Sequence, residues 1–456
     1  MYKKILIASL ALIAGLASCK KDDPTPSPNP PSTLTIDGVA STLEFYQLDT
    51  AHLSVAGVAK DAAAKAVWAV NGAKAAEGAT FDFTTAHPGK YEVTLTVDGK
   101  SAKQTYTVAP RFSEGAFLLN EGNFGNETGS LTYIHPSKKL VIDQAYFRVN
   151  GTKLGNVCQD LAFGNDQVYI LSQLGPKNGG EGLLTIANSH SLEKVKVYND
   201  EALAQSTPTH IAVLRDHIYI RTERDGILRG SSEGGFTPIT GTKKALKQRM
   251  AQIGERIFAL TKDNKILMIQ GTQVVRELDL SPAKPSGIAV SHDGKLWVST
   301  TSPNAILKVD PTPDNFVALD THILDKSISA TGPESWQRTT SSAFFAHGDK
   351  LYFTGQSSVI YCHDFATSKT SQVIDVKTID GVGTSANMYY NSLGVDPATG
   401  ELYYAAFEGY STYNKKNVTM VLKADGTKLL LREKVNSFPA GFYFIPNAAN
   451  RTGANR

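Results

Sequence analysis

Asp293-Gly-Lys-Leu-Trp-Val-Ser299 is one of seven closely similar segments in this chain, each a polar turn followed by an apolar strand with a central aromatic residue. The seven aromatic residues are Phe117, Tyr169, Tyr219, Phe258, Trp297, Tyr352 and Tyr403. Neighbouring aromatics are 39 to 55 residues apart, with a mean of just under 48. A repeat of this length built from short strands predicts propeller blades, so the chain is predicted to be all-β with a seven-bladed β-propeller.

The overall composition supports a β protein with more than one folded unit. The chain has 456 residues, of which 41% are hydrophobic and 20% are charged. This length favours two folded units joined by linkers. The formal net charge is only +3 and no basic stripe is present, so the sequence gives no support to nucleic-acid binding.

Residues 1–18 are predicted to be a lipoprotein signal peptide. Lys3 and Lys4 precede a short apolar run that is too short for a stable membrane span, and small residues follow it. The ending Leu16-Ala-Ser-Cys19 resembles the lipobox of bacterial lipoproteins, which implies that Cys19 is lipidated. The alternative is an ordinary cleaved signal followed by an incidental cysteine.

Residues 19–32 are predicted to form a lipidated stalk. The Pro-rich run Pro24–Pro31 is expected to be extended, which holds the folded part away from the bilayer. Lys20-Lys-Asp-Asp23 looks like the surface-export signal of certain Gram-negative lipoproteins, although four charged residues also make a plain spacer. We therefore expect a lipid-anchored protein of the outer membrane, exposed at the cell surface.

Residues 33–110 are predicted to form a small immunoglobulin-like β-sandwich in front of the propeller. Short strand-like runs alternate with turn signals, and Tyr91–Val97 has a strict period of two. The combination of W-x-V-N-G, F-D-F and P-G-K-Y-x-V-x-L-x-V resembles PKD-type domains. Trp68 is then expected in the core, and the domain is expected to be a spacer.

Residues 111–446 are predicted to be the propeller, and residues 447–456 a polar tail. In the fifth blade, strands are expected at 287–290, 295–299, 305–310 and 316–319. The last apolar segment, Ser437–Pro446, has no strand after it, while the first blade starts abruptly at Phe112. We therefore expect the C-terminal strand to complete the first blade and close the ring.

Loop lengths predict which face of the propeller binds ligands. The turns between the first and second strands, and between the third and fourth, are short. The connections on the opposite face include five long ones: 121–129, 174–182, 321–342, 381–390 and 407–417. Long loops on a rigid scaffold are the usual place for binding.

The sequence contains no recognisable catalytic or metal-binding motif. GxSxG, P-loop, HExxH and EF-hand patterns are absent, and no histidine pair has ligand spacing. Cys158 and Cys362 are expected to be buried, unpaired strand residues. We therefore expect a protein that is not an enzyme and has no cofactor.

Recognition is the remaining interpretation, because aromatic, amide and arginine side chains are frequent in the long connections. Such groups suit a large, flat, amide-rich or sugar-like ligand. The candidate ligand-binding residues are Asn120, Glu121, Asn123, Phe124, Gln173, Asn178, Arg221, Arg224, Trp336, Arg338, Gln356, Tyr389, Tyr390, Phe407 and Tyr410.

Three segments resemble YncE-like, surface-layer-type seven-bladed propeller lipoproteins. They are the phrase G-A-F-L-L-N-E-G-N-F-G-N-E-T-G-S-L-T-Y at 115–133, G-K-L-W-V-S-T-T-S-P-N-A-I-L-K-V-D-P-T at 294–312, and F-P-A-G-F-Y-F at 438–444. The likeness covers roughly residues 112–446, and N-E-G-N-F is its most specific part. One branch of this class captures cobalamin for a TonB-dependent transporter, so the resemblance implies a corrinoid ligand and a transporter partner. Asn120, Glu121, Asn123 and Phe124 fall in the matching loop.

Two other function classes remain open. A glycan-binding or adhesion propeller would suit the same layout of domains. A propeller hydrolase or lyase would need two carboxylates that approach across the channel. Its candidates on the long-loop face are Glu121, Glu181, Asp225, Glu334 and Glu408.

Overall fold

The computed structural model describes residues 33–40, 43–325, 344–355, 357–389 and 393–446. The predicted signal peptide, Cys19, the stalk and the polar tail lie outside these residues. The chain divides into two compact units: Met1–Ala40 with His52–Asp82 and Glu92–Thr105, and Ser41–Ala51 with Phe83–Tyr91 and Tyr106–Arg456. Every helix among the described residues is too short or too polar to cross a bilayer.

The N-terminal strands form two sheets, as the sandwich prediction requires. One sheet has the order β1 (Thr35–Gly38), β3 (Thr50–Ala56), β6 (Thr80–Thr84). The other has the order β2 (Phe45–Tyr46), β8 (Lys100–Ala109), β7 (Gly89–Val97), β4 (Val67–Val70), β5 (Ala73–Glu77). A single helical turn, α1 (Lys60–Ala63), follows β3. Trp68 is fully buried, as predicted, and its indole N–H donates to the Gly78 carbonyl at 2.9 Å.

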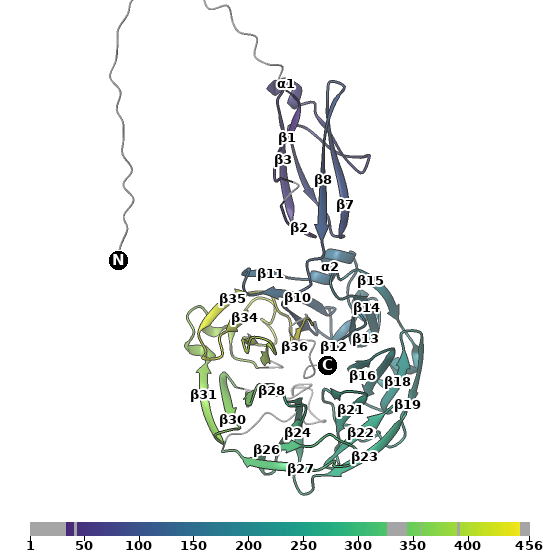
Figure 1. Cartoon of the computed structure of the whole chain (residues 1–456), viewed down its shortest axis with the longest axis vertical. Coiled ribbons are helices and arrows are strands. Elements are labelled where there is room, and N and C mark those ends of the chain that lie inside the picture. Colours follow the sequence, from purple (N-terminus) through teal and green to yellow (C-terminus); the bar gives the residue numbers. More distant parts are fainter. Residues whose placement is uncertain (1–32, 41–42, 326–343, 356, 390–392, 447–456) are drawn as a thin grey trace, which may run out of the picture. The chain divides into compact units, whose positions relative to one another are not determined.

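Seven further sheets have four strands each, and Figure 1 shows them arranged as a ring. The strands are given from the channel outwards. Blade 1 comprises β36 (Pro439–Phe444), β9 (Ala116–Asn120), β10 (Ser130–His135) and β11 (Leu140–Ile142). Blade 2 comprises β12 (Asn156–Gly164), β13 (Gln167–Gly175), β14 (Leu184–Asn188) and β15 (Lys194–Tyr198). Blade 3 comprises β16 (Pro208–Leu214), β17 (His217–Thr222), β18 (Gly226–Ser231) and β19 (Gly234–Pro238).

The other four blades follow the same order. Blade 4 comprises β20 (Ala251–Ile253), β21 (Arg256–Leu260), β22 (Lys265–Gln270) and β23 (Gln273–Asp279). Blade 5 comprises β24 (Pro285–Val290), β25 (Leu296–Thr301), β26 (Asn304–Val309) and β27 (Ala318–Ile323). Blade 6 comprises β28 (Phe344–His347), β29 (Lys350–Phe353), β30 (Val359–Asp364) and β31 (Lys369–Asp375). Blade 7 comprises β32 (Leu393–Val395), β33 (Leu402–Phe407), β34 (Asn417–Leu422) and β35 (Lys428–Glu433).

Short helices occupy several connections. The helices α2 (Ala145–Asn150), α3 (Glu201–Ser206), η2 (Val376–Thr378) and η3 (Gly383–Ser385) lie between blades, and η1 (Lys177–Gly179) lies between the second and third strands of blade 2. Helix α3 shows why such short helices form, because Asp200 caps it by accepting a hydrogen bond from the Leu203 amide at 2.8 Å.

Each of the seven repeated aromatics lies on the second strand of its blade, as predicted. All of them are buried and pack between neighbouring blades. The Trp297 ring meets the Phe365 ring edge-on at 4.0 Å between blades 5 and 6, for example. Each aromatic ring buries a large apolar surface between two blades, and this burial stabilises the contact between them.

The ring closes as predicted, by pairing of the two ends of the propeller. Strand β36 pairs with β9 in an antiparallel register that places Tyr443 opposite Phe117 and Phe442 opposite Leu118. The innermost strand of blade 1 therefore comes from the C-terminal end of the chain.

The outer strand of blade 5 begins two residues later than predicted, at Ala318. The Phe316 side chain is buried against Phe258, with ring centroids 6.0 Å apart, so this part of the chain is held in the core before the strand starts. Cys158 and Cys362 are buried and unpaired, as predicted.

A histidine pair, the buried His363 and the half-buried His322, joins blades 5 and 6 and predicts a pH dependence of stability. His322 Nδ1 and His363 Nε2 are 2.9 Å apart, so one uncharged ring donates its N–H to the other. Burial, followed by the charge of His322, lowers the pKa of His363, and Asp364 opposes this. The folded protein therefore binds the proton that charges His363 less readily than the unfolded chain does, whose histidines titrate near about pH 6.5.

The contribution of the uncharged histidine pair to the free energy of unfolding is complete above about pH 6.5 and is lost as the pH falls below that value. We expect the urea midpoint of the propeller to fall between about pH 7.5 and about pH 5.5, and to fall less in His363→Gln. Equal decreases in both proteins would show that this pair is not responsible.

Candidate functional site

The long connections among the described residues lie on one face of the ring, which we call the long-loop face. It is formed by the connections from the second to the third strand of each blade and from each fourth strand to the next blade. The opposite face has tight turns such as Asn165-Asp166 between β12 and β13 and Gly348-Asp349 between β28 and β29. The first strands of blades 1, 2, 3 and 5 each have a register shift at the end near the long-loop face, where Ala440, Gln159, Thr209 and Ser286 are the extra residues of these strands. Bulges of this kind redirect the chain at the rim of a sheet.

Phe124 is an aromatic platform at the edge of the channel mouth. Its side chain is 64% exposed on the connection between β9 and β10. The Lys177 ammonium lies 3.4 Å from the ring centroid, and the Asn178 amide donates to the Phe124 carbonyl at 3.2 Å. Blade 2 thus supports one face of this ring, while the remainder is open to solvent.

Tyr410 is a second platform, on the connection between β33 and β34 in blade 7. Its ring stacks on Phe438 with centroids 5.7 Å apart, and 40% of the residue is exposed. Phe438 is also stacked on Tyr413 at 4.6 Å and meets Phe407 at 5.2 Å. The half-buried Phe438 ring, itself packed on the buried Phe407 and Tyr413, fixes Tyr410 and leaves part of it open to a ligand.

A polar network holds the two platform-bearing loops together. The Glu127 carboxylate accepts a hydrogen bond from Ser437 Oγ at 2.8 Å. Burial, followed by the charge of Glu127 and a hydrogen bond to it, raises the pKa of Tyr413 in the other loop. Asn156 of blade 2 donates to the carbonyls of Asn123 and Glu127. The N-E-G-N-F loop is therefore tied to blades 2 and 7.

Three side chains form a cluster inside the channel, which we call the channel hub. They are Asp160 at its centre, Arg249 and Tyr443. The Tyr443 hydroxyl donates to Asp160 Oδ1 at 2.6 Å, and Arg249 Nε is 3.4 Å from the same oxygen. The Ile211 amide donates to Asp160 Oδ2 at 2.9 Å. Blades 1, 2 and 3 and the segment before blade 4 therefore meet at one carboxylate.

Arg249 reaches across the channel. Its guanidinium lies 4.3 Å from the Tyr443 ring centroid and 6.0 Å from that of Phe345 in blade 6. A Cβ on Gly441 would lie 2.0 Å from Arg249 Nη2, so glycine leaves the space that this side chain occupies. Burial raises the pKa of Asp160, and Arg249 and Tyr443 oppose the rise.

A second polar cluster lies above the hub, around Lys247. Lys247 Nζ is 3.9 Å from Glu223, which also pairs with Arg221 at 3.1 Å. Burial lowers the pKa of Lys247, and the charges of Glu121 and Glu223 oppose this. The Gln159 amide donates to Glu121 at 2.8 Å. Opposite charges from blades 1 and 3 therefore surround one lysine at the channel mouth.

Three of the predicted site residues are buried and serve the scaffold. The Asn120 amide donates to Ser130 and Thr132, and its carbonyl oxygen accepts from the Ser437 amide. Arg221 is 1% exposed and donates to the Ala245 carbonyl and Thr209. Phe407 is 1% exposed beneath Tyr410. We therefore place these residues in the support of the site.

The other predicted residues vary in position. Glu121 is 8% exposed, whereas Asn123 and Gln173 are half-buried. Arg224 is exposed in the turn between β17 and β18, and the half-buried Tyr389 donates to the Ala386 carbonyl. Trp336, Arg338, Gln356 and Tyr390 lie outside the described residues.

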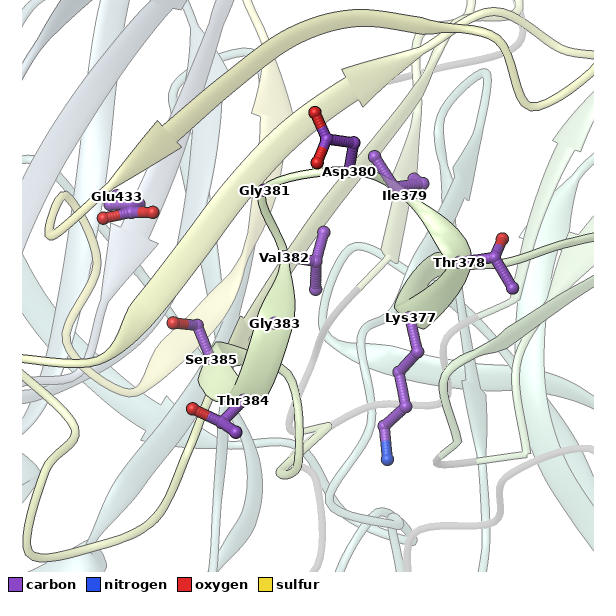
Figure 2. Close-up of a pocket in the computed structure, with 10 residues that line it drawn as sticks. All are labelled: Lys377, Thr378, Ile379, Asp380, Gly381, Val382, Gly383, Thr384, Ser385 and Glu433. Atoms are coloured by element: carbon purple, nitrogen blue, oxygen red, sulfur yellow. The ribbon is translucent and has the colours of Figure 1, made fainter.

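Figure 2 shows an open depression on the connection between blades 6 and 7, lined by Lys377–Ser385 and Glu433. Its charged side chains, Lys377, Asp380 and Glu433, point in different directions and do not converge. No group of three or more histidine, cysteine or carboxylate side chains suitable for a metal ion occurs in the described part of the chain.

The channel hub was not found from the sequence. Its signal is the charged residue in Cys158-Gln-Asp-Leu161, the one carboxylate of a buried strand. Such a group needs a partner when it is buried. The sequence does not show that the partners come from segments about 90 and about 280 residues away.

The family model described as "Domain of unknown function (DUF5074)" matches residues 114–446. No curated protein matches the chain. Among solved structures, the chain is similar to a quinonprotein alcohol dehydrogenase-like protein from Bacteroides thetaiotaomicron, with a TM-score of 0.57, 14% identity, and coverage of 92% of this chain and 98% of that chain. This likeness shows the fold.

Two further structures are less similar. A protein from Lactobacillus plantarum has a TM-score of 0.48 and 12% identity, with 73% of this chain and 99% of that chain covered. A functionally unknown protein from Desulfotomaculum acetoxidans has a TM-score of 0.45 and 13% identity, with the same shares covered.

Proposed function

The chain belongs to the DUF5074 family, and from this premise we propose that its propeller is a ligand-binding module that captures a corrinoid on the long-loop face. The observation that carries the proposal is the pair of half-open aromatic platforms, Phe124 and Tyr410, on loops of neighbouring blades that one polar network joins. Rigid aromatic groups in a supported setting are the usual anchors of binding sites.

A corrinoid fits the chemistry of this face. Its macrocycle is large, broadly flat and edged with carboxamides, so it offers apolar faces to aromatic rings and hydrogen-bonding groups to polar side chains. Asn123 and Asn178 provide amides beside the Phe124 platform, Gln173 provides a third amide in blade 2, and Glu121 and Lys247 provide charged groups at the channel mouth. The resemblance to cobalamin-capturing propeller lipoproteins selects this ligand among amide-rich molecules.

The same proposal includes the location and partner of the protein. Cys19 anchors the chain in the outer membrane, the Pro-rich stalk holds it at the cell surface, and the N-terminal PKD-like domain acts as a spacer. The loaded propeller delivers its cargo to a TonB-dependent transporter. Incorporation of a labelled lipid probe into the protein tests the anchor. We expect the parent protein to be labelled at Cys19 and the label to be lost in Cys19→Ser.

We expect Phe124→Ala and Tyr410→Ala each to weaken cyanocobalamin binding about tenfold or more, because each removes an exposed anchor without disturbing the core. Titration calorimetry of the whole chain measures this. Val195→Ala, which removes an exposed side chain from the outer strand of blade 2, is the control and should bind as the parent does.

No binding of cyanocobalamin to the unmodified chain at micromolar concentrations would contradict the corrinoid proposal. Binding to a glycan array that persists in excess cyanocobalamin would favour the glycan-binding alternative. In that case the same two platforms should be required, since sugar rings also pack on aromatic faces.

A further inference from the structure

Four neighbouring connections on the long-loop face form a surface that we call the basic arc. It consists of residues 223–225, 239–250, 261–264 and 280–284, which join the strands of blades 3, 4 and 5. Arg224, Lys243, Lys244, Lys262 and Lys284 are all exposed. Apart from Lys244, which pairs with Asp263 at 3.1 Å, none of these five has an ion-pair partner among the described residues.

Backbone and side-chain hydrogen bonds make the arc continuous. The Ile227 amide, beside the first segment, donates to Thr242 Oγ1 of the second at 2.9 Å. The Lys262 amide donates to the Lys244 carbonyl at 2.9 Å, and the Leu280 amide donates to the Asn264 carbonyl at 2.8 Å. The cations are therefore held on one connected surface.

Positive charge is concentrated in this arc. Its four segments contain seven lysine or arginine residues and three acidic residues, a net formal charge of +4 that includes Arg249, which pairs with Asp160 in the channel hub; the whole chain has only +3. The rest of the chain is therefore close to neutral. A local excess of one sign attracts a ligand of the other sign and raises its rate of association.

The inner end of the arc reaches the proposed ligand site. Lys247 belongs to the arc and lies at the channel mouth, where Glu121 acts on its pKa. Burial raises the pKa of Tyr410, and the charge of Glu121 adds to the rise, so Glu121 is close enough to act on both this platform and Lys247. A ligand that packs on Tyr410 can therefore extend a substituent towards the arc.

We propose that the basic arc binds an anionic phosphate-ester group of the ligand, so that the site takes a flat, amide-bearing molecule with a phosphodiester substituent. This inference rests on the proposed function and defines its ligand class more narrowly. Several lysines spread over a surface suit phosphate, whose charge is shared by its unesterified oxygens and persists at neutral pH. Among corrinoids, the complete molecule carries this phosphodiester in its nucleotide loop and cobinamide lacks it.

The test compares cyanocobalamin with dicyanocobinamide on the whole chain by titration calorimetry. The variant is the triple substitution Lys243→Gln, Lys262→Gln and Lys284→Gln. The matched control is Lys139→Gln, Lys369→Gln and Lys423→Gln, three exposed lysines at the short-turn face. Titrations at about 0.01 M and about 0.15 M ionic strength change the screening length from roughly 30 Å to roughly 8 Å.

We expect the arc variant to bind cyanocobalamin about tenfold more weakly at low salt, with a much smaller loss at high salt. Cobinamide binding should change little in the arc variant, and the control should bind both corrinoids as the parent does. Inorganic phosphate at millimolar concentrations should compete with cyanocobalamin only in proteins with the intact arc. Such competition would show that the arc binds phosphate by itself, without the rest of the ligand.

Equal effects of the arc variant on cyanocobalamin and cobinamide, or no effect on either, would overturn the phosphate-ester inference while corrinoid capture stands. Failure of both corrinoids to bind the parent chain would overturn the proposed function and this inference together. If phosphate still competed with cyanocobalamin in the arc variant, the phosphate site would lie outside the basic arc, which would also contradict the inference.

Discussion

Arg249→Ala is expected to lower the free energy of unfolding of the propeller by about 3–5 kcal/mol. The substitution leaves the Asp160 carboxylate buried inside the ring without its counter-charge, and it removes the side chain that reaches from the segment before blade 4 towards Tyr443 and Phe345. A buried charge without a partner costs far more than a surface ion pair contributes. Urea unfolding of the whole chain, followed by tyrosine and tryptophan fluorescence, measures the loss.

Two double variants separate charge from packing in the channel hub. Asp160→Asn combined with Arg249→Met removes both charges and should lose clearly less stability than the sum of the two single variants. Gly441→Ala should be costly in the parent, because its Cβ would lie 2.0 Å from Arg249 Nη2 and its φ of 149° is strained for alanine; combining it with Arg249→Ala should remove the first cost and leave the second. Additive effects in both pairs would contradict a direct interaction.

Trp297→Ala is expected to cost about 3–5 kcal/mol, because it empties the largest buried site between blades 5 and 6. The ring is 1% exposed and meets Phe365 at 4.0 Å. It belongs to one apolar cluster with Ile306, Leu351 and Phe353. Thermal and urea unfolding should both show the loss.

Trp297→Phe is the matched control. The indole Nε1 is buried without a hydrogen-bond partner in the described part of the chain, so phenylalanine removes an unsatisfied donor while keeping most of the ring. We expect a loss of less than about 2 kcal/mol. Tyr410→Ala, by contrast, should change stability little, and a large loss there would mean that this ring is part of the core.

The fold was largely predictable because it depends on local patterns that repeat. Each aromatic residue follows its turn at a constant offset, so the second strand of every blade could be located from sequence alone. The unpaired apolar segment at the C-terminal end predicted the closing strand, which the pairing of Tyr443 with Phe117 confirms. Blade boundaries were less certain because tertiary packing decides them, as the burial of Phe316 shows.

The site was less predictable, because exposure depends on contacts between distant segments. Asn120 and Arg221 are of residue types that often contact ligands, but their polar groups form hydrogen bonds within the propeller itself. Phe124 and Tyr410 are exposed because Lys177 and Phe438 support them from neighbouring blades or loops. No local pattern distinguishes these two cases. Asp160 and Arg249 were missed for the same reason.

Hydrogen–deuterium exchange of the whole chain with and without cyanocobalamin tests the central claim most directly. The account predicts slower exchange in the loops at residues 121–129 and 408–416 and in the segment at 239–250, with no change in the short turns at 165–166 and 215–216. Protection confined to the short-turn face, or no protection at saturating cyanocobalamin, would contradict a corrinoid site on the long-loop face.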